Sequence, residues 1–225
     1  MSVLNQEFEN FEYIIIDGQS KDKTLSIINQ YKKDIVHIVS EPDNGIYFAM
    51  NKGANLANGE FLVFVNSGDI LTRKALLIIH DKISQNQKID FIFGTVKRHY
   101  TKDTILKYGF DKKKLFYNFD FATSHSTGFY IRNSIFKKIG LFNTKYKCSA
   151  DYDVYYKLLI IYNLIGSSTE KHELIGEVSP GGFSSTISPF EHIIEEIKIR
   201  IDNGQNKFFI FLIFLNALLK YFYKK

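Results

Sequence analysis

Three short polar clusters in the first third of the chain have the residue types of a ligand-binding site. Each cluster directly follows an apolar run, and together they are Asp17-Gly18-Gln19-Ser20, Ser40-Glu41-Pro42-Asp43-Asn44-Gly45 and Asn66-Ser67-Gly68-Asp69. A carboxylate in such a cluster can hold a hard divalent cation or take a proton from a hydroxyl group. Each cluster taken singly is also typical of a turn. Three of them at one edge of a sheet favour a binding site.

The segments around these clusters alternate between strand and helix patterns. Short apolar runs at residues 13–16, 35–39, 61–65 and 91–93 predict buried strands. Helical periodicity predicts a helix that Ser20 caps, a second over residues 45–57 and a third over residues 73–85. Strands separated by single helices predict an α/β fold with a mostly parallel sheet. In such sheets ligands bind outside the carboxyl ends of the strands, where the three polar clusters fall.

The second half of the sequence has a less regular pattern. Residues 129–132 read as a strand, residues 134–139 as a short helix and residues 151–161 as a longer helix. Two further helices are predicted over residues 189–201 and 207–223. Residues 97–125 are basic and aromatic, and their pattern favours no element. We expect one domain with a C-terminal helical tail.

Composition narrows the functional class. The chain has 225 residues, 45% of them hydrophobic, which is typical of a packed globular protein. The single cysteine, Cys148, excludes an intramolecular disulfide framework and a four-cysteine metal site. The net charge of +5 is small and spread along the chain, and no basic-aromatic motif accompanies it. We therefore expect no nucleic-acid partner.

Several segments, in the right order and spacing, resemble the family-2 glycosyltransferases. The segments that carry the resemblance are residues 12–20, 40–47, 49–53, 66–69 and 150–153. The resemblance implies an inverting, nucleotide-sugar-dependent transferase with the Rossmann-like glycosyltransferase A fold. It places the catalytic domain in residues 1–190 and leaves residues 191–225 as C-terminal helices. It also implies a saccharide or lipid-linked saccharide as acceptor, in the synthesis of a surface polysaccharide.

The resemblance also implies roles for individual residues. Asp151 matches the general base, and Asp69 matches the last acid of the metal-binding D-x-D motif, here reduced to Ser67-Gly68-Asp69. Asp17 is placed against the base or ribose of the nucleotide. The remaining expected donor-binding residues are Ser20, Gly45, Asn51 and Ser67, and the expected substrate-binding residues are His125 and Asp153. Helix capping by Asp69 and Asp151, an ion-paired Asp153 and a structural His125 are the alternatives.

The implied reaction gives these residue types a physical purpose. A diphosphate leaving group develops negative charge, which a divalent cation, Mg²⁺ or Mn²⁺, neutralises. Magnesium keeps several waters, so that one protein carboxylate, Asp69, can suffice as its protein ligand. A sugar hydroxyl is a poor nucleophile until a carboxylate accepts its proton. One direct displacement inverts the anomeric centre and needs a single base.

One departure from the family pattern affects the expected fold. Members of the family begin with a strand, whereas Met1 of this chain aligns inside the helix that follows that strand. Loss of a buried central strand exposes two unpaired edges and a large apolar area. Either the true start lies upstream, or the chain is an inactive remnant or a binding module that keeps part of the fold.

The C-terminal tail suggests a membrane surface as a further partner. Residues 207–223 are apolar nearly all round a helix, with lysines at both ends and aromatic residues near the last ones. A buried core helix explains the apolar faces, whereas a helix in the headgroup region explains the lysines as well. The apolar run is too short to span a bilayer. We expect a cytoplasmic protein, peripheral on the inner face of the cell membrane.

Overall fold

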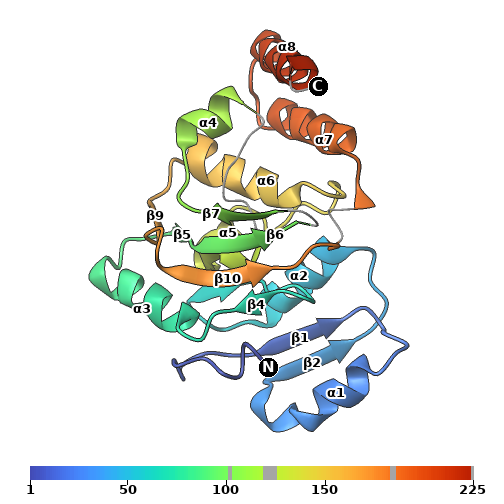
Figure 1. The fold of residues 1–225 in the computed structure, drawn as a ribbon, viewed down its shortest axis with the longest axis vertical. Helices are drawn as coiled ribbons and strands as arrows, with labels where there is room; N and C mark the ends of the chain where they lie inside the picture. The colour runs from blue at the N-terminus through green and yellow to red at the C-terminus, as the bar shows by residue number, and fades with distance from the viewer. Residues whose placement is uncertain (101–102, 119–125, 183–185, 224–225) are drawn as a thin grey trace.

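A computed structural model describes residues 1–100, 103–118, 126–182 and 186–223. Strands and helices alternate through residue 93, as the sequence pattern predicts, except that the two-residue strand β4 directly follows β3 (Figure 1). The elements of this half are β1 (Ile14–Asp17), α1 (Thr24–Gln30), β2 (His37–Ser40), α2 (Ile46–Leu56), β3 (Phe61–Val63), β4 (Ile70–Leu71), α3 (Ala75–Gln85) and β5 (Phe91–Phe93). The α/β fold class is confirmed.

The second half adds the strands β6 to β10 and the C-terminal helices. Its elements are β6 (Thr95–His99), β7 (Thr104–Lys107), α4 (Lys112–Tyr117), β8 (Phe129–Arg132), α5 (Asn133–Lys138), α6 (Ala150–Tyr156), β9 (Gly166–Ser168), β10 (Leu174–Val178), α7 (Pro189–Asp202) and α8 (Lys207–Tyr223). A π-helical turn, Lys157–Ile161, continues α6 and accounts for the predicted helix over residues 151–161. Both C-terminal helices lie where the sequence predicts them.

The described strands form three sheets, and their directions correct the expected mostly parallel sheet. β1 and β2 pair in parallel, while the other sheets have the orders β4-β10-β6-β7 and β3-β8-β5-β9. β8 lies antiparallel between β3 and β5, because the chain returns to the sheet from the opposite end after the β6–β7 hairpin and α4. β5–β9 and β6–β10 are parallel. The two larger sheets are therefore mixed.

The main core lies between the β3-β8-β5-β9 sheet and α6. Phe93, Phe129 and Tyr155 are fully buried, with ring centroids 4.8–5.2 Å apart. A second apolar cluster packs α3 against the other face of β5 and β8 through Ile79, Ile92 and other residues. Burial of these aromatic side chains provides much of the hydrophobic stabilisation that holds the sheet and α6 together.

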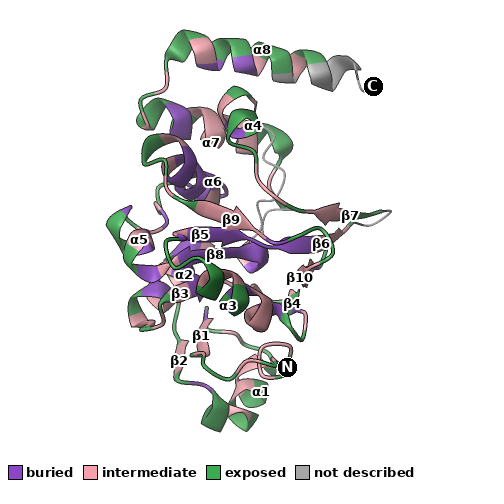
Figure 2. Cartoon of the chain, turned by 90° about the vertical axis from the view of Figure 1, so that its left-hand side faces the viewer, coloured by how far each residue is buried: buried purple, intermediate pink, exposed green. Residues whose placement is uncertain are grey.

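β1, β2 and α1 form a less buried unit beyond β3. Figure 2 shows β1 and β2 below β3, in a region where half-buried residues predominate over buried ones. The three isoleucines of β1 are only half-buried, and α1 has no buried residue. In contrast, all three residues of β5 are completely buried. The side chains of β1 are therefore less buried than the apolar sequence pattern of this strand predicts.

The ends of two helices differ in how well the sequence predicts them. The prediction that Ser20 caps the first helix is wrong, because α1 starts at Thr24 after Lys23 and Ser20 instead donates a hydrogen bond to Asp17. α7 begins with a complete capping box, in which Ser188 and Glu191 each satisfy the backbone N–H of the other. Proline at its first position adds a fixed φ suited to a helix start.

Candidate active site

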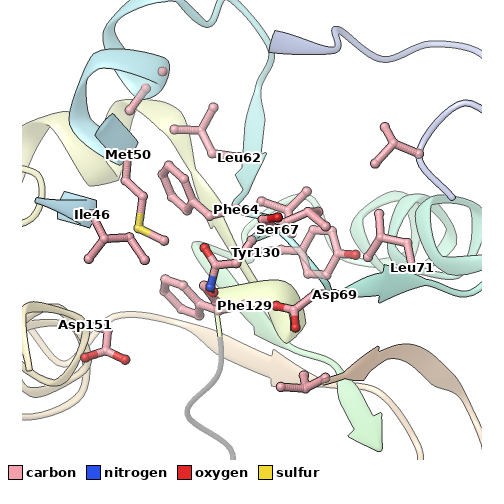
Figure 3. A pocket seen from close by; sticks show the side chains of 18 of the residues that line it. Ile46, Met50, Leu62, Phe64, Ser67, Asp69, Leu71, Phe129, Tyr130 and Asp151 are labelled. Carbon is pink, nitrogen blue, oxygen red and sulfur yellow. The ribbon is translucent and has the colours of Figure 1, made fainter. Parts of the chain in front are cut away.

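A large cavity opens between the β3 sheet, α2 and α6. Its volume is 1720 Å³, which exceeds the 300–1,000 Å³ that is typical of a small-molecule site. Asp69, from the segment after β3, and Asp151, from the first turn of α6, both line it and lie on either side of Phe129 in Figure 3. Ser67 also faces this cavity. The structure thus brings together the two carboxylates that the sequence analysis places in the reaction.

Asp69 is oriented by two groups from distant parts of the chain. Its Oδ2 accepts a hydrogen bond from the Thr127 hydroxyl at 2.6 Å, and its Oδ1 accepts one from the backbone N–H of Ser179 at 3.3 Å. Gly68 adopts a positive φ of 90°, which a side chain would strain, and its carbonyl accepts from the Ser179 hydroxyl. Asp69 does not cap α3, which starts at Ala75 after Lys74.

Asp151 is held at the N-terminus of α6 by two donors. Its Oδ1 accepts from the Tyr47 hydroxyl at 3.1 Å and from the backbone N–H of Tyr152 at 2.9 Å. Burial raises the pKa of Asp151 above its ordinary value, although the two donors and the nearby His192 act in the opposite direction. A carboxylate with a raised pKa accepts a proton more readily near neutral pH, as a general base must.

A third carboxylate, that of Glu195 on α7, fixes the loop that leads into α6. Its oxygens accept hydrogen bonds from the backbone N–H groups of Lys147, Cys148 and Ser149 at 2.6–3.0 Å. Burial raises the pKa of Glu195, but these donors outweigh burial and lower the pKa below its ordinary value of 4.5. Glu195 therefore positions the backbone immediately before Asp151. The sequence analysis did not single out Glu195, and no local motif marks it.

We expect Glu195→Gln to lower the melting temperature at pH 7 by about 2–4 °C. A hydrogen bond to a charged acceptor contributes about 1 kcal/mol more than one to a neutral acceptor. Because the folded pKa is depressed, this stabilisation is full above pH 4.5 and disappears as the pH falls through the folded pKa. Calorimetry from pH 3 to pH 7 measures the difference, with exposed Glu170→Gln as the matched control. A pH-independent difference would contradict this role.

Asp17 and Ser20 organise the ends of β1 and β2. Asp17 is buried and accepts hydrogen bonds from the Ser20 backbone and hydroxyl and from the Ser40 hydroxyl. Burial raises the pKa of Asp17, but these donors outweigh it and lower the pKa. Asp43, in the neighbouring loop, lines the cavity, and its carboxylate leaves no room for a side chain at Gly18. Asp17 and Ser20 thus hold the carboxyl ends of β1 and β2 together.

Three other predicted residues make contacts within the fold. Gly45 precedes α2 with a φ of 127°, a conformation that favours glycine. The Asn51 amide makes two hydrogen bonds with the backbone of Phe142, at 2.8 and 3.0 Å. Asp153 is 1% exposed, forms an ion pair with Lys157 and accepts a hydrogen bond from Asn203. This arrangement matches the ion-paired alternative given for Asp153 in the sequence analysis. The remaining predicted site residue, His125, lies outside the described residues.

The cavity contains polar residues that the sequence analysis did not assign to the site. Tyr47 was noted only as part of a motif, yet its hydroxyl binds Asp151. His192 was set aside for lack of ligand spacing, yet it lines the cavity and its Nδ1 lies 3.3 Å from the Ser149 hydroxyl. Arg98, from β6, lines the cavity and stacks over the Tyr100 ring. No local sequence signal predicts that these residues share a cavity with Asp151, because they lie 41 to 104 residues from it.

Comparison with known sequences decides the family. The profile of glycosyl transferase family 2 matches residues 1–140 of the chain. The chain belongs to this family. A PGL/p-HBAD biosynthesis glycosyltransferase of Mycobacterium bovis is 29% identical over 193 residues, which is 83% of this glycosyltransferase and 72% of the relative.

Solved structures share the fold. Staphylococcus aureus TarS in complex with UDP superposes with a TM-score of 0.68 at 16% identity over 93% of this glycosyltransferase. A mannosyltransferase from Pyrobaculum calidifontis, in complex with GDP-Man and Mn²⁺, gives a TM-score of 0.64 at 13% identity over 94%. The chain spans 62% and 61% of those two chains. These likenesses confirm the glycosyltransferase A fold.

The residues around Asp69 decide which kind of divalent cation the predicted site can hold. Within the described part of the chain, no three His, Cys, Asp or Glu side chains gather into a metal-binding group. Asp69 can provide one carboxylate ligand, because its side chain lines the cavity and a carboxylate has two acceptor oxygens. This donor set fits a hard ion that takes its remaining ligands from a diphosphate and water, and it does not fit zinc.

Proposed function

We propose that this glycosyltransferase moves a sugar from a nucleotide-sugar donor to a hydroxyl group of a saccharide or lipid-linked saccharide, with inversion at the anomeric carbon. The observation that carries the proposal is that Asp69 and Asp151, on separate elements, line one cavity. The two carboxylates differ in surroundings. Asp151 has a raised pKa and accepts a hydrogen bond from Tyr47, whereas Asp69 accepts hydrogen bonds from Thr127 and Ser179. Different surroundings suit different roles.

Asp151 acts as the general base. It takes the proton of the acceptor hydroxyl while that oxygen bonds to the anomeric carbon. The bond from this carbon to the diphosphate oxygen breaks in the same displacement, and its electron pair leaves with the nucleoside diphosphate. The hydrogen bonds of Tyr47 and the Tyr152 backbone orient the carboxylate for the transfer.

Asp69 lies at the donor's diphosphate. A Mg²⁺ or Mn²⁺ ion bound there would neutralise the charge that develops on the leaving group. Asp69 would hold it through a carboxylate oxygen, and Thr127 and Ser179 fix that carboxylate. Arg98, which lines the same cavity, adds a positive charge suited to phosphate oxygens.

Donor titration tests the proposal. Calorimetric titration with UDP-, GDP- and dTDP-sugars, each with and without Mn²⁺, is expected to give binding of one donor that depends on the ion. Nuclear magnetic resonance of the product would then report the anomeric configuration, and retention would overturn the proposed single displacement. Donor binding without turnover towards any saccharide acceptor would favour the alternative, a binding module. The half-buried β1 strand is the feature that supports this alternative.

We also propose that α8 docks on a membrane surface. One side of α8 packs against the protein, where Ile210 and Ile213 are buried and the Phe209 ring lies 5.4 Å from Phe116. The opposite side forms an exposed apolar stripe of Phe208, Phe211, Leu212, Leu215 and Leu219. Figure 1 shows α8 at one extremity of the molecule. Within the described residues, no helix has the length and apolar character needed to cross a membrane.

An exposed apolar stripe is costly in water and is stabilised where a helix lies in the headgroup region. We expect the chain to sediment with vesicles of phosphatidylglycerol and phosphatidylcholine at low salt. Replacing Phe208, Phe211 and Leu215 by serine should lower the partition coefficient at least about 10-fold, because each side chain contributes about 1.5–3 kcal/mol when buried. Serine at exposed Ile27, Val36 and Ile105 is the matched control. A parent chain that stays in the supernatant would overturn this proposal.

A further inference from the structure

The surface next to α8 carries a cluster of lysines that the proposed reaction does not use. Lys112, Lys113 and Lys114 follow one another in α4, and all three are exposed. Exposed aromatic and aliphatic residues of α4 and of the end of the π-helical turn lie around them. We call the whole cluster the α4 patch, and its residues are Lys112, Lys113, Lys114, Tyr117, Ile161 and Tyr162.

Contacts between α4 and the neighbouring segments hold the patch together. Lys112 Nζ donates a hydrogen bond to the Asn163 side chain at 2.6 Å, which places the end of the π-helical turn beside the start of α4. At the other end of α4, the Tyr117 ring lies 5.6 Å from the ring of Phe209 on α8. Figure 2 shows α4 and α7 below α8, with exposed residues of α4 towards the viewer. The α4 patch is therefore continuous with α8, the helix that carries the exposed apolar stripe.

α4 is a short helix, yet buried contacts fix its position. Leu115, on its inner side, is completely buried. Arg200 of α7 is also completely buried and donates hydrogen bonds to the backbone carbonyls of Leu115 and Phe116, at 2.6 and 2.9 Å. Its guanidinium carbon lies 5.7 Å from the ring centres of Tyr152 and Tyr156 on α6. Arg200 thus joins α4 to the helix of the proposed base, so the lysines stand on a fixed element.

The composition of the α4 patch indicates the kind of partner. Three consecutive lysines concentrate positive charge, and Asp111, the acid before them, caps α4 by accepting from the backbone N–H groups of Lys113 and Lys114. Lysine side chains near a bilayer are attracted to its anionic lipids. Tyrosine combines an apolar ring with a polar hydroxyl, a combination that favours the headgroup region. A bilayer surface suits both residue types, whereas a small soluble anion would leave the exposed rings in water.

We propose that the α4 patch binds the anionic headgroups of a phospholipid bilayer while the apolar stripe of α8 enters the same surface. This inference rests on the proposed docking of α8 and adds a second contact to it. The three ammonium groups pair with lipid phosphates, and the rings of Tyr117 and Tyr162 lie at the level of the headgroups. Two separate contacts fix the orientation of the protein on the membrane, whereas one helix leaves it able to rotate about that helix.

Vesicle sedimentation tests the α4 patch. Replacing all three lysines of the patch by glutamine is expected to lower the partition coefficient on phosphatidylglycerol vesicles at least about 10-fold at low salt, and the difference should shrink at high salt. The variant should match the parent on pure phosphatidylcholine. The matched control replaces Lys23, Lys32 and Lys33, exposed lysines at the opposite end of the molecule (Figure 1), and removes the same charge. We expect this control to stay within about threefold of the parent.

A fluorescent label measures the contact directly. An environment-sensitive dye on Tyr162→Cys is expected to shift its emission to the blue on phosphatidylglycerol vesicles, whereas the same dye on Val36→Cys, at an exposed site far from the patch, is not. The native Cys148 is buried. An unshifted emission from Tyr162→Cys, or a lysine variant that binds as tightly as its control, would overturn the proposal.

The two membrane contacts fail in different ways. If the serine variant of the α8 stripe binds like the parent while the lysine variant binds more weakly, docking of α8 is wrong and the α4 patch stands as the contact. If only the serine variant loses binding, the α4 patch is wrong. A parent chain that binds neither kind of vesicle would overturn both. None of these outcomes depends on sugar transfer, so they stand apart from the proposed reaction.

Discussion

Asp151→Asn is expected to lower kcat by about 100-fold or more while the donor dissociation constant stays within about threefold of the parent value. Asparagine keeps the size of the side chain and can accept the Tyr47 hydrogen bond at the same oxygen, but it cannot take a proton from the acceptor. Single-turnover rates and donor titrations measure the two quantities. Sugar transfer within threefold of the parent would refute Asp151 as the base.

The pH dependence separates the role of the base from a structural role. Asp151 must be ionised to act, so kcat/KM is expected to fall as the pH drops through its raised pKa, above the ordinary value of 3.8. This acid limb should be absent in Asp151→Asn. Tyr47→Phe is the matched variant, because it removes a donor that lowers the pKa and keeps the carboxylate. We expect its acid limb to move to higher pH with a smaller loss of kcat.

Asp69→Ala is expected to weaken donor binding by about 100-fold in the presence of Mn²⁺ or Mg²⁺ and to have little effect in chelator. A carboxylate that holds the ion at the diphosphate contributes to binding only when the ion is present, and such contributions amount to several kcal/mol. Calorimetric titration of the donor, with each ion and with chelator, measures the difference. Equal losses under both conditions would show that Asp69 acts without a cation.

Thr127→Val provides the control for the Asp69 experiment. Valine removes the hydroxyl that donates to Asp69 at 2.6 Å, while the carboxylate itself remains. Residues that orient a metal ligand typically contribute 10- to 100-fold to affinity, so we expect a smaller loss than in Asp69→Ala, still dependent on the ion. A loss in Thr127→Val that persists in chelator would indicate a disturbed fold, since Thr127 is fully buried.

Local pattern alone determined most of the elements. Apolar runs predicted β1 and β5, and helical periodicity predicted α2 and α8, because burial on one face or both leaves a period in the sequence. The resemblance to the family also indicated Asp69 and Asp151, because each stands in a motif of only a few residues. The pattern failed over residues 97–125, where β6, β7 and α4 form, because partly exposed strands of mixed polarity carry no clear period.

Only the tertiary structure decided what these residues contact. β8 has the pattern of any buried strand, and its antiparallel place between β3 and β5 depends on pairing with strands that lie far away in the sequence. Tyr47 contacts Asp151 from 104 residues away, and Glu195 contacts Ser149, just before α6, from 46 residues away. Asp153 follows Asp151 by only two residues, yet its side chain pairs with Lys157 and does not line the cavity. Such contacts follow from the packing of whole elements. A local sequence period indicates which face of a helix or strand is buried, but it does not indicate which other element covers that face.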